Sequence, residues 1–289
     1  MSIPANTYCM ECLLKKHLAT ARSLGSGEKA YAFGKEIMKL FLQAGPTDSS
    51  AVLGARINDL YQSWYGLPQD RFTEEKEQSN RFVMERLDTI RSRTFSSADP
   101  IHTGLQYAIM GNYIDFSALG KDVSFDTLER MLDQPEQFAV EQAVLQNFCR
   151  ELSGAKTLLY ITDNAGELGF DQVFAEVLQK AYPQLTITFC VRGKPAHNDA
   201  TIEDYRQLAL PFPVIENGSD IGGTDLDSVN VQTIEALQNS DVILSKGMGN
   251  TETLWGSGYN IYYAFLVKCK RLQEVFGLPF MSAAFVKEK

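Results

Sequence analysis

From Gly154 onward the chain alternates short apolar runs with segments of helical pattern, and this alternation limits the fold more than any other feature. Buried strands and helices that follow one another in this way form βαβ units around a mainly parallel sheet. The pattern therefore predicts a Rossmann-like α/β/α domain over residues 151–289. The expected strands are 156–162, 185–192, 212–215, 241–244, 261–267 and 280–285, with helices over 166–181, 201–208, 231–238 and 270–276.

The first half of the chain has apolar residues at three- and four-residue spacing, which is the spacing of amphipathic helices. Helices are expected over 11–24, 28–43, 50–64, 70–93, 102–110, 124–132 and 135–152, and Ser124 is of a residue type that begins helices. The expected fold class is thus α/β, with an N-terminal helical lobe over residues 1–150 beside the α/β/α domain.

The charge of the chain bears on its partners. The formal net charge is −9, whereas proteins that neutralise nucleic-acid phosphates are usually basic, so DNA and RNA are poor candidates. No basic segment followed by an apolar one stands at the N-terminus, and the longest apolar run, 261–267, is far too short to span a membrane. We therefore expect a cytoplasmic, enzyme-like protein with no membrane partner. The oligomeric state stays open.

Polar clusters follow three of the expected strands. The first contains Asp163, Asn164 and Glu167, the second contains Asn198 and Asp199, and the third runs from Lys246 through Gly247, Gly249 and Asn250 to Glu252. Each cluster by itself is explained as well by a helix cap or a turn, because these residue types are favoured there. Parallel strands, however, end at one edge of the sheet, where ligands bind in open α/β folds. The recurrence of such clusters at three strand ends favours a functional crevice.

The clusters suit the binding of a metal ion and a phosphate. Oxygen atoms of Asp163, Asn164 and Asp199 are the donors that hard divalent cations prefer. Lys246 offers a positive charge to phosphoryl oxygens, and a helix that begins near Asn250 offers its N-terminus. A Walker A loop and a Gly-x-Gly-x-x-Gly fingerprint are both absent from the sequence. His197, beside these residues, is expected to be a surface histidine.

The same segments, taken in order, resemble the damage-control phosphatase family, formerly domain of unknown function 89. They are Asp99-Pro100, Gly111-Asn112-Tyr113-Ile114-Asp115-Phe116, Asp163-Asn164-Ala165-Gly166-Glu167, Asn198-Asp199-Ala200-Thr201, Asn217-Gly218-Ser219-Asp220 with Gly223-Thr224, and Lys246 to Glu252. The resemblance implies a metal-dependent phosphatase of small phosphometabolites. It places the metal ligands at Asp163, Asn164 and Asp199 and the phosphate-site lysine at Lys246. The cation is magnesium, manganese, cobalt or nickel, which the resemblance does not distinguish.

Cys9 and Cys12 form a CxxC pair near the N-terminus, a motif also carried by one microbial branch of that family. Five cysteines, an odd number, and no visible signal peptide argue against a disulfide scaffold. One CxxC is half of a typical zinc site, and a thioredoxin-like pair would follow a strand. Three roles stay open for the Cys9–Cys12 pair: packing near the surface between the lobes, metal binding and redox chemistry. Packing is favoured. Cys149, Cys190 and Cys269 are expected to pack in the core.

The leading hypothesis is hydrolysis of a phosphomonoester on a small, possibly damaged, phosphorylated metabolite. Asp163 and Lys246 are the candidate catalytic residues, and the nucleophile is either water or the Asp163 carboxylate. Contacts to the substrate or to the residues around it are assigned to Asn112, Asp115, Glu167, Asn250 and Glu252. Two alternatives remain: an S-adenosylmethionine-dependent methyltransferase, which would need a glycine-rich first loop and an acidic end to the second strand, and a non-catalytic phosphometabolite-binding protein. The identity of the substrate lies beyond the sequence.

Overall fold

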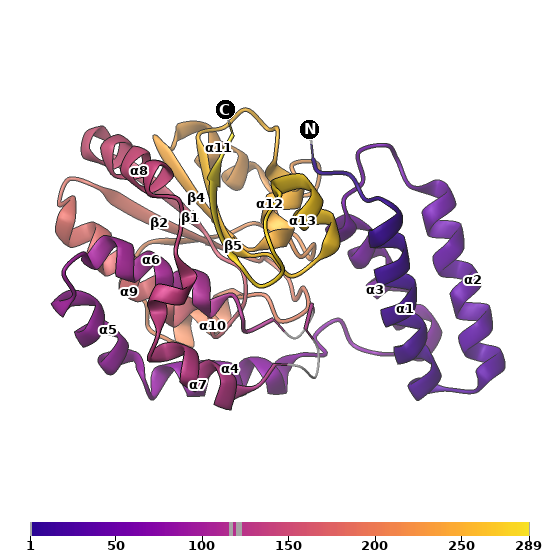
Figure 1. The fold of residues 1–289 in the computed structure, drawn as a ribbon. Coiled ribbons are helices and arrows are strands. Elements are labelled where there is room, and N and C mark those ends of the chain that lie inside the picture. Colours follow the sequence, from indigo (N-terminus) through magenta and orange to yellow (C-terminus); the bar gives the residue numbers. More distant parts are fainter. Residues whose placement is uncertain (1, 116–117, 120–122, 289) are drawn as a thin grey trace.

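A six-stranded sheet forms the centre of the protein (Figure 1). The computed structural model describes residues 2–115, 118–119 and 123–288, so Phe116 lies outside the described residues. The strands are β1 (Thr157–Ile161), β2 (Thr186–Val191), β3 (Val214–Glu216), β4 (Val242–Lys246), β5 (Ile261–Leu266) and β6 (Ala283–Lys287). Their order is β3-β2-β1-β4-β5-β6, and all neighbours are parallel except β5 and β6. The α/β fold with a mainly parallel sheet is confirmed.

The order of the strands reverses between β1 and β4, so this is the switch point at which open α/β sheets bind ligands. Side chains of each strand alternate between two separate cores. Leu158 and Tyr160 of β1 face one core, and Leu159 and Ile161 face the other. Helices α6 (Pro100–Gly111), α8 (Gln142–Gly154), α9 (Leu168–Ala181) and α10 (Ile202–Gln207) contribute to the first core, and α11 (Val231–Asn239), α12 (Met248–Leu254) and α13 (Lys270–Phe276) to the second.

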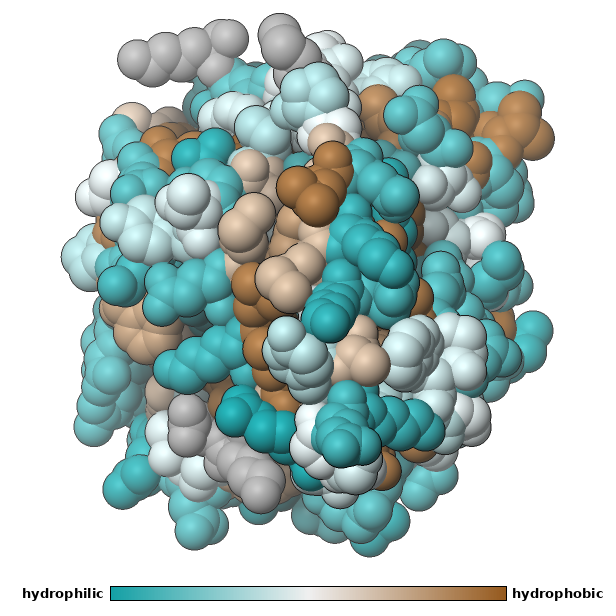
Figure 2. Space-filling view, turned by 90° about the vertical axis from the view of Figure 1, so that its right-hand side faces the viewer, coloured by the Kyte–Doolittle hydropathy of each residue, from teal (hydrophilic) through white to brown (hydrophobic). Residues whose placement is uncertain are grey.

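Helices α1 (Thr7–Leu24), α2 (Gly27–Gln43) and α3 (Ser50–Tyr65) form a unit with a core of its own, which we call the α1–α3 unit. It stands at the right of Figure 1, beside α12 and α13. Figure 2 looks onto this side of the molecule and shows brown, apolar groups among polar ones; α2 exposes Met38 and Leu42. The predicted boundary at residue 150 stays a prediction, and the first core includes residues from both sides of it.

Two expected helices are interrupted. The segment 70–93 forms α4 (Thr73–Met84) and α5 (Leu87–Ser96), separated by a turn at Glu85 and Arg86, because the two halves pack at different points along α9. The segment 135–152 forms a 3-10 turn (Pro135–Phe138) that buries Phe138, and extended backbone precedes α8. Ser124 caps α7 (Phe125–Leu132) as predicted, accepting a hydrogen bond from Thr127 N. Among the described residues no helix is long and apolar enough to cross a membrane.

Candidate active site

The two aspartates predicted as metal ligands lie close together at the carboxyl edge of the sheet. Asp163 comes two residues after β1, and Asp199 lies on the loop that follows β2. The backbone ties these loops to each other: Ala200 N donates to Asp163 O at 2.7 Å, and Asn164 and Asp199 form an isolated antiparallel bridge. Because β1 and β2 are parallel neighbours, both loops leave the sheet at the same edge. The first two of the three predicted clusters are thus brought together, and their convergence with the third on one crevice stays a prediction.

Asp163 is 6% exposed and is held by two amides. Nδ2 of Asn112 and Nδ2 of Asn164 donate to its Oδ2 at 2.7 and 2.9 Å. Burial raises the pKa of Asp163 well above its ordinary value, and the negative charges of Asp199 and Glu167 raise it further. A cation bound beside this carboxyl group would act in the opposite direction, because its positive charge favours the ionised form.

Asp199 is 5% exposed and pairs with the guanidinium of Arg192, whose Nε donates to Asp199 Oδ2 at 2.6 Å. Burial raises the pKa of Asp199 to about 6, and the charge of Arg192 opposes the rise. Within the described residues, the side-chain hydrogen bonds to Asp163 and Asp199 all end on Oδ2. The Oδ1 atom of each aspartate thus lies outside these bonds.

Asn164, the third predicted ligand, is tied into the same network. Its Oδ1 accepts from Asn198 Nδ2 at 2.9 Å, and its Nδ2 also donates to Glu167 at 3.1 Å. A carbonyl oxygen has two lone pairs, so Oδ1 retains one for a cation. In the described part of the chain, no group of three or more histidine, cysteine, aspartate and glutamate side chains is arranged to hold a metal ion. The predicted metal ligands, Asp163, Asn164 and Asp199, are not a group of this kind because one of the three is an asparagine.

Gly247 gives Asp163 the space it occupies. A Cβ atom at this position would lie 2.1 Å from Asp163 Cγ, and the φ of +82° is one that residues with side chains rarely adopt. Gly247 connects β4 to α12, so the carboxylate of Asp163 lies against the start of that helix. The glycine is therefore required by both its conformation and its neighbour.

Lys246 lies beneath the site and does not face it. The side chain is fully buried, and its ammonium donates to Ala108 O at 2.8 Å, to Asp171 Oδ1 at 2.7 Å and to Glu167 Oε1. An ammonium group has three N–H bonds, and these three acceptors use all of them. The prediction of a phosphate-facing lysine is corrected here, because the lysine neutralises two buried carboxylates. Glu167 also accepts from Asn112 at 2.9 Å, which links Lys246 to Asp163.

Asp115, a predicted substrate contact, forms an ion pair with Lys268, 2.7 Å away. Lys268 also donates to Asn112 O at 2.6 Å, and its charge opposes the rise that burial causes in the pKa of Asp163. The sequence analysis did not assign Lys268 or Arg192 to the site. Each follows the carboxyl end of a strand, β5 for Lys268 and β2 for Arg192, and this position could have identified them as site residues. Asp171, whose pKa burial raises to about 7, was not assigned to the site either.

The remaining predicted contacts have structural partners. Asn250 donates to Thr162 O at 2.9 Å and to Lys246 O at 2.7 Å, which joins the ends of β1 and β4. Glu252 accepts from Ser50 Oγ at the start of α3 and so joins the α1–α3 unit to α12. These contacts account for the burial of both residues. Their contact with substrate stays a prediction.

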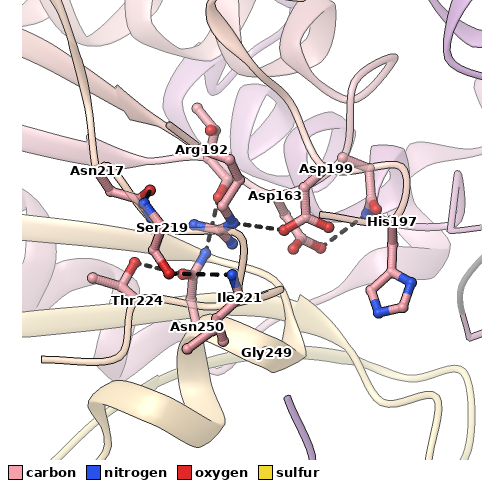
Figure 3. A network of polar contacts seen from close by, with 12 residues as sticks. Asp163, Arg192, His197, Asp199, Asn217, Ser219, Ile221, Thr224, Gly249 and Asn250 are labelled. Carbon is pink, nitrogen blue, oxygen red and sulfur yellow. Dashed lines mark hydrogen bonds and ion pairs between the residues drawn. The ribbon is translucent and has the colours of Figure 1, made fainter. Parts of the chain in front are cut away.

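His197 differs from the expected surface histidine. Its ring is half-buried, 5.9 Å from the ring of Phe72, and Nε2 lies 3.5 Å from Nδ2 of Asn58 on α3. Burial lowers the pKa of His197 to about 3, helped by the charges of Lys16 and Arg71. This shift favours a neutral imidazole. Figure 3 shows His197 beside Asp199, and its contact with Asn58 reaches the α1–α3 unit.

The charges of the site fit a divalent cation. The site contains five buried carboxyl groups and three buried cations, so the excess is two negative charges when all of them are ionised. The carboxyl groups are Asp115, Asp163, Glu167, Asp171 and Asp199, and the cations are Arg192, Lys246 and Lys268. Lys16, half-buried near Asp115, offsets one of these at most. Net negative charge in a dry environment is costly unless a cation neutralises it. Charge and oxygen donors both fit a divalent metal ion.

Comparison with known proteins identifies the family of this chain. The family model of the damage-control phosphatase ARMT1-like domain matches residues 5–279. The chain belongs to this family. The matched range contains all of the site residues described above, together with Cys9 and Cys12. The resemblance of the sequence to the damage-control phosphatase family is confirmed.

Three archaeal proteins show how far the likeness to the damage-control phosphatases extends. A damage-control phosphatase of Archaeoglobus fulgidus is 30% identical, covering 79% of each chain, and one of Pyrococcus horikoshii is 29% identical, covering 73% of this chain and 72% of the other. An uncharacterised protein of Methanocaldococcus jannaschii is 29% identical over 96% of this chain and 93% of its own. A crystal structure of a Pyrococcus horikoshii protein of this family superposes with a TM-score of 0.83 and 24% identity, covering 100% of both chains, and supports the fold.

The cysteine pair of this family member lies at the start of α1. Cys9 is buried and Cys12 is exposed, and burial raises the pKa of the Cys9 thiol. The described cysteines are all free thiols, and Cys190 is buried in the sheet as expected. Cys149 and Cys269 are half-buried against the two cores. The burial of Cys9 fits packing, and the choice between packing, metal binding and redox chemistry stays a prediction.

Proposed function

We propose that the protein is a metal-dependent phosphatase that hydrolyses phosphomonoesters of small metabolites. The observation that carries the proposal is the pairing of Asp163 and Asp199, whose Oδ1 atoms lie outside the hydrogen-bond network in a region of excess negative charge. Membership of the damage-control phosphatase family supports the reaction class. Neither observation selects a substrate.

Asp163, Asn164 and Asp199 would hold the cation. A bound divalent ion supplies a positive charge that polarises a phosphoryl oxygen and lowers the pKa of bound water. The oxygen donors suit magnesium and manganese, and nickel and cobalt are the further candidates. The cytoplasmic location expected from the sequence agrees with such a substrate and stays a proposal.

The other residues of the site keep the two aspartates in place. Asn112 fixes Asp163 and is itself fixed, because its Oδ1 accepts from Leu266 N at 3.1 Å. Arg192 orients Asp199 from the opposite side. Hydrogen-bonded partners of this kind set the geometry and basicity of metal ligands. Either water or the Asp163 carboxylate attacks the phosphorus, and both mechanisms require this fixed geometry.

The test is phosphatase activity of metal-stripped protein resupplied with Mn²⁺, Co²⁺, Ni²⁺ or Mg²⁺, against a panel of sugar phosphates, nucleotides and phosphopantetheine compounds. Asp163→Asn and Asp199→Asn keep the shape of each side chain and remove its charge, and each should lower kcat/KM by about 100-fold or more. Asp88→Asn is the control, since this aspartate is 99% exposed on α5. Wild-type turnover in Asp163→Asn or Asp199→Asn would refute the proposal. Tight binding without turnover would favour a phosphometabolite-binding protein instead.

A further inference from the structure

Arg192 is the largest fully buried side chain in the described structure, and only part of its hydrogen-bonding capacity is used. Its Nε donates to Asp199, whereas Nη1 and Nη2 are buried without a hydrogen-bond partner among the described residues. A buried cationic donor without an acceptor is strongly unfavourable, so such groups are rare in folded proteins. The four N–H bonds of the two Nη atoms therefore indicate an acceptor that the chain does not provide.

A second unpartnered donor belongs to the same part of the molecule. Asn217 is fully buried, and its Oδ1 accepts from Gly193 N and Ser219 N, both at 2.9 Å. Its Nδ2, like the Nη atoms of Arg192, has no partner in the described part of the chain. Asn217 is thus held against the residue that follows Arg192. Figure 3 shows Arg192 between the Asn217–Ser219 loop and the carboxylates of Asp163 and Asp199.

We propose that Arg192 and Asn217 bind an oxygen-rich anion, and that this anion is the phosphoryl group of the substrate, retained afterwards as inorganic phosphate. The unused groups of both residues are N–H donors, and one of the two residues carries a positive charge, so they repel a cation and suit phosphoryl oxygens. A guanidinium presents its donors in a plane that matches two oxygens of a phosphate. The inference rests on the proposed phosphatase function.

This assignment gives the phosphate a different partner from the one the sequence suggested. Lys246 has no N–H to offer, since Ala108, Glu167 and Asp171 accept all three. Arg192, in contrast, touches Asp199 with one nitrogen and has two nitrogens left. The phosphoryl group then lies between the guanidinium and the proposed cation, with positive charge on both sides. A substrate without a phosphoryl group cannot use this arrangement.

The test measures the affinity for inorganic phosphate by calorimetry, with and without saturating Mn²⁺. Asn217→Asp keeps the oxygen that accepts from Gly193 and Ser219 and replaces only the unpartnered donor by a negatively charged oxygen. Arg192→Lys keeps the charge and removes the fork of donors. Each should raise the Kd for phosphate by about tenfold or more. Lys194→Gln, an exposed lysine two residues from Arg192, should leave it unchanged.

The melting temperature and the Kd for Mn²⁺ are measured on each variant, so that a loss of fold or of metal binding is not read as a loss of phosphate binding. Wild-type phosphate affinity in folded Asn217→Asp and Arg192→Lys would overturn the inference, and so would an absence of phosphate binding by the wild type in both conditions. Failure of the phosphatase function gives a different result: phosphate binds and depends on both residues, yet no phosphomonoester is turned over.

Discussion

At the scale of single residues, the site depends on side chains whose burial is explained by a specific neighbour. Gly247 is the sharpest case, because its Cβ-less backbone lies against Asp163. Gly258 has the same φ of +82°, but no atom lies within 4 Å of the position that a Cβ atom would take. A substitution at Gly258 therefore measures the free-energy cost of backbone strain alone. Comparing substitutions at the two glycines therefore separates the cost of backbone strain from the cost of the steric clash with Asp163.

We predict that Gly247→Ala lowers the free energy of unfolding by about 2–4 kcal/mol, through strain and overpacking together. Gly258→Ala should lose about 1–2 kcal/mol, from strain alone. Urea denaturation measures both values, and metal affinity should fall only in Gly247→Ala, because only that change displaces Asp163. Equal losses in the two variants would show that the neighbour of Gly247 plays no part.

Lys246 supports the site from below, and its replacement should act on stability. Lys246→Met leaves Glu167 and Asp171 buried without their cation. Removing one partner of a buried ion pair costs about 3–5 kcal/mol, so we predict a loss of unfolding free energy of this size. Chemical denaturation gives the stability, and calorimetry with phosphate gives the affinity of any folded fraction. A stable variant that has lost phosphate binding would return Lys246 to the role that its sequence suggested.

At the scale of helices and strands, the sequence predicted what depends on local pattern. The six strands were evident because their apolar runs are short and bounded, and Asp163 and Asp199 followed from the rule that parallel strands end at one edge. The break between α4 and α5 was not evident, because it depends on packing against α9. Whether a lysine or arginine side chain is buried or faces a ligand likewise depends on tertiary contacts, which the local sequence pattern does not show. The sequence therefore predicted that Lys246 faces the phosphate, whereas the structure gives its ammonium group three acceptors within the protein, and the sequence did not reveal the unpartnered donors of Arg192.

The packing of α1 against α3 contains a buried histidine. His17 is 3% exposed, its Nδ1 lies 3.2 Å from the hydroxyl of Tyr61, and burial lowers its pKa from 6.5 to about 2. The folded protein holds this imidazole neutral, whereas the unfolded chain protonates it below pH 6.5. Stability from this group is therefore complete above pH 6.5 and is lost as the pH falls, by about 1.4 kcal/mol per pH unit.

We predict that His17→Gln, which cannot titrate, removes this part of the pH dependence. Between pH 6.5 and 4.5 the wild type should lose about 2–3 kcal/mol of unfolding free energy more than the variant does. Acids with raised pKa values, such as Asp171, change stability in the opposite direction but equally in both proteins. Urea denaturation at several pH values measures the difference. Parallel curves for the two proteins would contradict the prediction.

At the scale of the whole molecule, the α/β body buries more carboxyl groups than cations at its site, and the α1–α3 unit makes polar contacts with α12 and with the Asp199 loop. These contacts include Ser50 with Glu252 and Asn58 with His197. The α1–α3 unit is thus attached next to the ligand-binding edge, while its own core holds it together. Anything that neutralises the buried charge should therefore stabilise the body of the protein directly.

We predict that divalent cations raise the stability of the metal-stripped protein, by about 2.7 kcal/mol when the free ion is at 100 times its Kd. At a fixed concentration of the ion the rise should grow between pH 5 and pH 7, because the ion must displace protons from Asp163 and Asp199, whose pKa values burial raises. Melting curves against Mn²⁺ concentration measure it, with Asp163→Asn/Asp199→Asn as the matched protein that lacks both charges. An equal response to Mn²⁺ in both proteins would place the ion elsewhere on the molecule.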